Sequence, residues 1–142
     1  MLFRSLLRSG WGRIVNVTTS LSTMQRRRNS PYGVSKAAIE TETLIWAQDL
    51  EGTNVSCNSL IPGGAVETAF LSAAGKEEAK TNGRTLLQPE VMISPILWLC
   101  SNLSDGINGK RYVGTFWKPE MEIEAGVAAA LEAPVLLTPS EP

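Results

Sequence analysis

Tyr32 and Lys36 are the two residues of this sequence whose types and spacing are best suited to acid–base chemistry. Ser30 and Pro31 precede them as the expected N-cap and first residue of a helix. Residues at positions i and i+4 share one helix face, which would place the phenol beside the ammonium. A neighbouring cation favours the charged form of a phenol. Tyr32 could therefore give a proton to a developing alkoxide, or take one from an alcohol, near neutral pH.

Two short apolar segments flank this helix and are expected to be strands. Residues 13–18 and 54–61 are rich in β-branched and other apolar side chains, and a third such segment spans residues 109–114. The helix should run from residue 32 to about residue 50, where a Glu-Gly-Thr sequence ends it. A strand, a helix and a second strand form a βαβ unit, whose strands run parallel. The pattern predicts an α/β fold with a parallel sheet of about three strands and flanking helices.

Further helices are expected on both sides of this unit. Residues 2–9 place their large apolar side chains on one face. A second helix is expected near residues 68–81, within a long polar connection, and a third opens at the Gln-Pro-Glu of residues 88–90. The tail carries a weak Ala-rich helix at residues 123–131, and Pro-rich coil follows it.

Polar and glycine residues follow the first two expected strands at the point where each strand ends. Thr19 and Ser20 come directly after the first strand, and the Pro-Gly-Gly of residues 62–64 comes after the second. Ligands of open parallel sheets bind beyond the carboxyl ends of the strands, so these residues should lie close to Tyr32. A hydroxyl there could hold the reacting oxygen by a hydrogen bond, and the glycines would let the backbone approach a flat ligand closely.

Composition limits the classes of function that fit the chain. The 142 residues are 43% apolar and carry a net charge of −1, so a globular domain is expected and nucleic-acid binding is not. No apolar run approaches the roughly 20 residues of a membrane span, and no membrane association is expected. The chain has no His, so no metal site is expected. Cys57 and Cys100 lie far apart in apolar runs and are expected to be buried thiols, which indicates a reducing, cytoplasmic location.

Three consecutive arginines at residues 26–28 lie in the polar loop before Tyr32. Such a run can form a site for a phosphate or an acidic ligand, or it can lie in a solvated loop. Charge runs are more often solvated, so the solvated loop is the preferred interpretation.

Four segments occur in a fixed order along the chain: GRIVNVTT at residues 12–19, YGVSKAA at 32–38, VSCNSLIPGG at 55–64 and INGK at 107–110. Their sequences, order and spacing resemble the second half of the short-chain dehydrogenase/reductase family, from about residue 2 to residue 117. The resemblance implies that residues 1–117 form the C-terminal part of a Rossmann-type domain, a partial Rossmann-like sheet. Residues 118–142 would be a C-terminal extension of weak helix and then coil.

The resemblance also implies an oxidoreductase that uses NAD or NADP and transfers hydride between an alcohol and a carbonyl of a small molecule. Tyr32 would be the acid/base, and Lys36 would assist it and bind the nicotinamide ribose. The family's serine, about thirteen residues before the tyrosine, corresponds in position to Thr19, with Ser20 one step further, and both stay candidates. The helix of residues 32–50 resembles the family's main dimer helix, so a homo-oligomer is expected. The expected cofactor contacts are Tyr32, Lys36, Pro62, Gly63, Gly64 and Thr68.

The sequence departs from the family pattern at its N-terminal side. No Gly-rich dinucleotide fingerprint occurs, so the family's N-terminal dinucleotide-binding half is expected to be missing. The first strand would then be an open apolar edge, and the isolated chain would be marginally stable or prone to association. The alternative interpretation is a truncated, non-catalytic family member that at most dimerises through the helix of residues 32–50. The epimerase and dehydratase branch shares the Tyr-x-x-x-Lys pattern, but the Pro-Gly after the second strand resembles the short-chain type.

Overall fold

Four strands form one open sheet in the computed structural model, which describes residues 3–135. The order is β1 (Gly12–Val17), β2 (Val55–Ile61), β3 (Arg111–Val113) and β4 (Leu131–Glu132). The first three strands are parallel, as predicted, and β4 joins β3 in the antiparallel direction. The sequence predicts about three strands. The fourth strand, β4, is not predictable because two residues are too few to show a period of two.

The predicted βαβ unit is confirmed, with a different start to its helix. Helix α3 (Tyr32–Asp49) connects β1 to β2, and the strand pairing runs from Gly12 opposite Val55. Ser30 does not cap the helix, and Pro31 itself occupies the cap position. The reason is that the first turn finds main-chain acceptors upstream: Gly33 N–H donates to Asn29 O (2.7 Å), and the Ser35 N–H donates to Pro31 O (2.9 Å). A side-chain cap is therefore not needed to satisfy these two groups.

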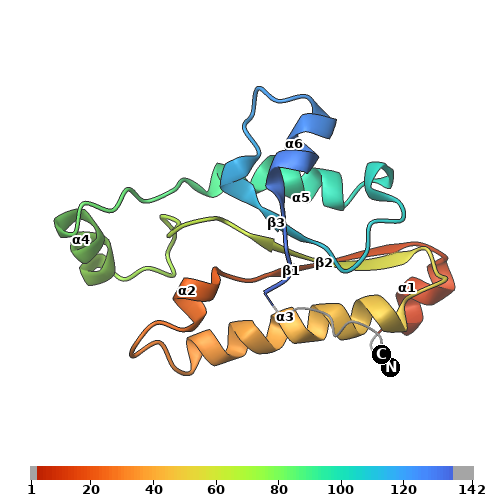
Figure 1. The fold of residues 1–142 in the computed structure, drawn as a ribbon, viewed down its shortest axis with the longest axis horizontal. Helices are drawn as coiled ribbons and strands as arrows, with labels where there is room; N and C mark the ends of the chain where they lie inside the picture. Colours follow the sequence, from red (N-terminus) through yellow and green to blue (C-terminus); the bar gives the residue numbers. More distant parts are fainter. Residues whose placement is uncertain (1–2, 136–142) are drawn as a thin grey trace.

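Helices cover both faces of the sheet (Figure 1). On one face lie α1 (Arg4–Ser9) and α3, and their core contains Phe3, Leu50, Val55 and Cys57. On the other face lie α5 (Ile93–Leu99) and α6 (Ile123–Ala130). Their core is larger and contains Leu60, Trp98, Leu99, Tyr112, Trp117 and Ala130.

Short helices shape the loops around the sheet. Ser20 caps α2 (Leu21–Met24), which the sequence analysis left as loop. Helix α4 (Ala73–Thr81) is shorter than expected because Ser72 caps it, and Figure 1 shows it at the far end of a long connection. The helix expected from residue 88 opens as a 3-10 turn, η1 (Pro89–Met92), before α5. Two further 3-10 turns are η2 (Asn102–Ser104) and η3 (Gly114–Phe116).

The two cysteines have different environments. Cys57 lies in β2 and is buried, whereas Cys100 follows α5 and is exposed, so the expectation of two buried thiols is wrong for Cys100. Cys100 is the C-cap of α5. The two residues before it, Trp98 and Leu99, are buried in the core, and Cys100 itself faces outward.

Strand β1 is an edge of the sheet as the structure describes it over residues 3–135. Val17 is 44% exposed on that strand. No helix within residues 3–135 is long and apolar enough to span a membrane. The Pro-rich coil expected after residue 131 lies mostly outside the described residues.

Candidate active site

All eight sequence-predicted site residues line one cavity of about 870 Å³ beyond the carboxyl ends of β1 and β2. They come from three separate parts of the chain: the β1–α2 junction, the start of α3 and the loop after β2. Parallel strands bring these parts to one edge of the sheet. The residues are Thr19, Ser20, Tyr32, Lys36, Pro62, Gly63, Gly64 and Thr68.

Lys36 is held in place beside Tyr32. Its Nζ donates a hydrogen bond to the backbone O of Val17 (2.9 Å) at the end of β1. The same Nζ lies 5.8 Å from the centroid of the Tyr32 ring, within reach of a cation–π contact. On the other side, the Phe70 ring packs against Tyr32 at 5.7 Å between centroids. An ammonium has three donors, so two remain after the bond to Val17.

The two candidate hydroxyls differ in their hydrogen bonds. Ser20 Oγ accepts from the Thr23 N–H (3.3 Å) and donates to Thr23 Oγ1 (2.9 Å), because Ser20 is the N-cap of α2. Within residues 3–135 no hydrogen bond engages the Thr19 hydroxyl, and only its backbone O is bonded, to Arg111 Nη2 (3.1 Å). Of these two candidates, Thr19 is therefore the one whose hydroxyl is free within the described residues.

Gly63 has little space around it. Its φ is +93°, a conformation that favours glycine. A Cβ there would overlap the Thr115 hydroxyl and lie 2.8 Å from Val113 Cγ1. Gly64 is also close-packed, since a Cβ would lie 2.9 Å from Leu87. Gly63 therefore lets the loop pass close to the end of β3, and Gly64 lets it pass close to Leu87.

A buried ionic network lies behind the loop that carries Thr19. Arg111 Nε donates to Glu40 Oε1 (3.1 Å), and both side chains are 4% exposed. Glu40 also accepts from the hydroxyls of Thr18 and Ser59, the latter at 3.3 Å. Arg111 makes a further ion pair with Glu132 in β4. The network therefore joins α3, β3 and β4 to the end of β1.

Sequence reasoning missed several residues of the cavity. Arg26 was considered only as one member of an arginine run, and Arg84 and Asn29 were not considered for this site, but all three line it. The run at residues 26–28 was a usable signal for Arg26. Arg84 follows a glycine turn in a polar connection, and nothing in its local sequence distinguishes it from a solvated arginine.

The connection from β2 to η1 closes one side of the cavity. Val66 and Leu87 form an isolated parallel bridge, which brings the two ends of this connection together. Hydrogen bonds from Gln88 and then from Lys76 lower the pKa of Glu67 and keep its carboxylate charged. The segment is thus fastened at its base while α4 extends outward (Figure 1).

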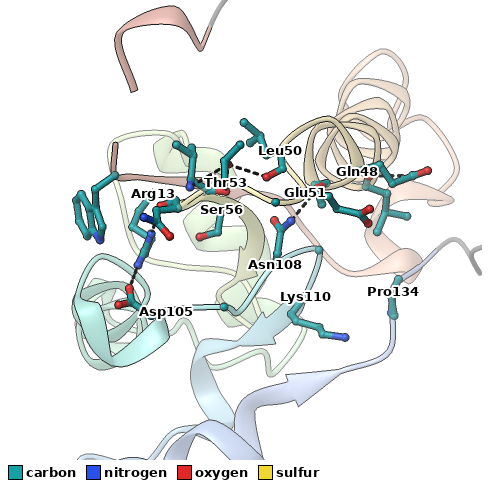
Figure 2. Close-up of a pocket in the computed structure, with 18 residues that line it drawn as sticks. Arg13, Gln48, Leu50, Glu51, Thr53, Ser56, Asp105, Asn108, Lys110 and Pro134 are labelled. Atoms are coloured by element: carbon teal, nitrogen blue, oxygen red, sulfur yellow. Dashed lines mark hydrogen bonds and ion pairs between the residues drawn. The ribbon is translucent and has the colours of Figure 1, made fainter. Parts of the chain in front are cut away.

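A second cavity, of about 750 Å³, lies at the amino ends of the strands (Figure 2). Arg13 dominates it: the guanidinium pairs with Asp105 and stacks on Trp11 at 4.5 Å from the ring centroid. Arg13 Nε and Ser56 Oγ are buried there without a hydrogen-bond partner within the described residues. The tyrosine–lysine pair lies at the opposite end of the strands, so the acid–base chemistry belongs to the first cavity.

The family of the chain is settled by comparison with known proteins. Residues 2–114 match the family model described as enoyl-(acyl carrier protein) reductase. The chain belongs to the short-chain dehydrogenase/reductase family. A short-chain type dehydrogenase/reductase of Picea abies is 42% identical over 76 residues, which are 54% of this chain and 27% of that protein. NADPH-dependent aldehyde reductase 2 of Arabidopsis thaliana is 31% identical over 110 residues, 74% of this chain and 40% of the relative.

Solved structures of short-chain dehydrogenases confirm the Rossmann-like α/β fold. One from Beutenbergia cavernae, described as an NAD(P)-dependent gluconate 5-dehydrogenase with bound NADP at low occupancy, has a TM-score of 0.64 at 30% identity. The match covers 78% of this chain and 47% of that one. A short-chain dehydrogenase from Salmonella enterica also has a TM-score of 0.64, at 25% identity. This short-chain dehydrogenase/reductase chain therefore spans less than half the length of these relatives.

Proposed function

We propose that the chain provides the catalytic half of an NAD(P)-dependent oxidoreductase that interconverts an alcohol and a carbonyl. One observation carries the proposal: Tyr32, the fixed ammonium of Lys36 and the free hydroxyl of Thr19 line a single cavity at the carboxyl edge of the sheet. These are the groups that proton transfer to and from an alcohol oxygen requires. The named relatives are reductases and dehydrogenases, so they give no support to a purely dimerising, non-catalytic chain.

Each of these residues has a distinct role in the proposed reaction. Tyr32 Oη gives a proton to the carbonyl oxygen during reduction and takes it back during oxidation. The Thr19 hydroxyl donates a hydrogen bond to the same oxygen and stabilises its developing charge. Ser20 keeps Thr19 in place by capping α2, which starts at the next residue. Lys36 stabilises the phenolate that forms on Tyr32, because its ammonium is held on that side by Val17 O.

The described residues fit the nicotinamide and ribose half of the cofactor. Lys36 has two ammonium donors left for ribose hydroxyls, and Thr68 offers a further hydroxyl in the lining of the cavity. The loop of residues 62–64 presents backbone rather than side chains to a flat ring. When bound, the nicotinamide supplies or accepts the hydride. The choice between NAD and NADP is left open by these residues.

We further propose a homo-oligomer that forms through α3. Its outward face carries Val34 at 67% exposure and Ile45 at 51% exposure, eleven residues apart on one side of the helix. Exposed apolar side chains on one helix face, here called the apolar stripe, suit packing against a second copy of the helix. A cytoplasmic location agrees with the two free cysteines.

The test of the proposed function is Tyr32→Phe in the full gene product. We expect turnover of carbonyl substrates to fall at least about 100-fold, since the general acid is lost, while nicotinamide binding stays within about twofold. Stopped-flow turnover and fluorescence titration with NADH and NADPH give the two readouts. Thr19→Val should lose activity, and Ser20→Ala should lose less. Unchanged turnover in Tyr32→Phe would remove Tyr32 from the mechanism.

A further inference from the structure

Three cations and no carboxylate line the candidate active site. Lys36, Arg26 and Arg84 contribute to its wall, and no Asp or Glu does so among the described residues. A cleft lined by charges of one sign concentrates ligands of the opposite sign. Proton transfer at Tyr32 uses Lys36 and does not need the two arginines. Their presence suggests that they bind an anionic group of the ligand.

The guanidinium groups of Arg26 and Arg84 have no protein partner within residues 3–135. Four ion pairs occur in this part of the chain, and none includes either arginine. Within the described part of the chain, only the backbone of these two residues makes hydrogen bonds: their N–H groups donate to Thr23 O and Ala79 O, and Arg26 O accepts from the Asn29 N–H. Both side chains are exposed, so their planar forks are open to the oxygens of a carboxylate.

The two arginines reach the cavity from different segments. Arg26 follows α2, whereas Arg84 follows α4 in the connection that closes the other side. Arg27 and Arg28 belong to the same run as Arg26 and do not line the cavity. Two unpaired cations around one cavity repel each other. An anion bound between them would attract both and so offset that repulsion. A ligand that contacts both arginines would enter between the two segments that carry them.

The cavity also offers room for a short carbon skeleton. Val66, Phe70 and Leu71 line it together with Arg84, and Phe70 packs against Tyr32. The cavity thus carries an acid–base group, an apolar surface and two free cations. A molecule with a carbonyl or hydroxyl, a few carbons and an anionic end matches all three.

We propose that the substrate is a small oxo acid or hydroxy acid, whose carboxylate binds Arg26 and Arg84 while its carbonyl or hydroxyl oxygen lies at Tyr32. The inference rests on the proposed function, because it names the substrate class of the same site. The shared chemistry is recognition of an anion by two arginines. A phosphate of the dinucleotide is the other possible source of that anion, and the experiment below separates the two.

Calorimetric titration of the full gene product with 4-oxopentanoate and with its methyl ester tests the proposal without any turnover. We expect the acid to bind at least about tenfold more tightly than the ester, and less tightly as salt is raised. Arg26→Gln and Arg84→Gln should each weaken binding of the acid about fivefold to tenfold and leave the ester unchanged. Arg27→Gln is the matched control, and it should behave as the parent chain does. Circular dichroism verifies that each exposed-site variant is folded.

Three results would overturn the substrate assignment: no saturable binding of the acid, equal affinity for acid and ester, or equal effects of Arg26→Gln and Arg27→Gln. A separate titration with NADP+ identifies the source of the anion. If Arg26→Gln and Arg84→Gln weaken NADP+ binding and leave the acid unaffected, the arginines serve the cofactor and the assignment fails. The two proposals can also fail separately. If the acid binds in a charge-dependent way but Tyr32→Phe keeps full turnover, the proposed function is wrong and the anion site stands.

Discussion

At the level of single residues, the hydrogen bonds within the protein determine which polar groups of the site are free to bind a ligand. Ser20 uses its hydroxyl to cap α2, whereas Thr19 keeps its hydroxyl free within the described residues. Lys36 donates one hydrogen bond to Val17 O, and this bond holds its ammonium beside the Tyr32 ring. A side chain that is fixed by one bond and free for others loses less entropy when a ligand binds.

Gly63→Ala should destabilise the chain by about 2–3 kcal/mol, because a positive φ and close contacts add up there. Gly83→Ala is the control, since its φ is +65° and a Cβ would meet nothing within 4 Å. The control should cost only about 1 kcal/mol. Urea unfolding followed by circular dichroism gives both free energies of unfolding. Equal losses at the two positions would show that Thr115 and Val113 do not restrict Gly63.

Stability should fall at alkaline pH through Cys57. Burial, and then the charge of Glu42, raise the pKa of Cys57 to about 12, whereas an unfolded thiol ionises near pH 8.5. The unfolded state therefore loses its proton first, so the free energy of unfolding is unaffected below about pH 8.5. Above that pH it should decrease by up to about 1.4 kcal/mol per pH unit.

Urea unfolding at a series of pH values from 7 to 10 measures this dependence. Cys57→Ala should flatten the slope above about pH 8.5, and Cys100→Ala, at an exposed position, should leave the slope as it is. Burial also raises the pKa of Tyr112 to about 12, which adds a second loss only above about pH 10. A slope that Cys57→Ala leaves unchanged between pH 8.5 and 10 would contradict the assignment.

At the scale of elements, the Arg111–Glu40 pair connects three strands to α3. Arg111 contacts Glu40 in α3, Thr19 O at the end of β1 and Glu132 in β4. Buried charges must be paired, because an isolated one pays its full desolvation cost. The short strand β4 is thus attached to the sheet by a charge as well as by its two paired residues.

Arg111→Met should destabilise the chain by about 3–5 kcal/mol, because it leaves the Glu40 carboxylate buried without a cation. The double variant Glu40→Gln/Arg111→Met should recover part of that loss, since no buried charge remains. The exposed pair of Lys76 and Glu67 is the control, and Lys76→Ala should cost less than about 1 kcal/mol. A double-mutant cycle from chemical denaturation measures the coupling. If the losses of Glu40→Gln and Arg111→Met, measured singly, add up to the loss of the double variant, the pair is not coupled.

At the scale of the whole molecule, two features face outward: the edge of β1 and the apolar stripe on α3. The described residues leave β1 paired on one side only. Exposed strand edges promote association with other chains unless something covers them. The expectation of a marginally stable or associating chain stays a prediction, and the two features predict different sites of association.

Ile45→Glu should convert an α3-mediated oligomer into monomers, because it places a charge on the apolar stripe. Ile93→Glu on α5 is a matched control, since Ile93 is 50% exposed and Ile45 is 51% exposed. Size-exclusion chromatography with light scattering measures the mass of each variant. If Ile93→Glu dissociates the oligomer and Ile45→Glu does not, α3 is not the interface.

The sequence by itself determined the order of the main elements and the tyrosine–lysine pair. The elements β1, α3 and β2 could be predicted because their signals are local: each is marked by the periodicity of its own side chains and by stop residues at its ends. The eight candidate residues could be grouped because parallel strands end at one edge of a sheet. Only the tertiary structure shows the partner of Arg111, the engagement of Ser20 in a helix cap, the place of β4, and that Arg84 and Arg26 line one cavity. Each of these depends on contacts between residues far apart in the chain or on hydrogen-bond geometry, and local sequence carries no signal of either.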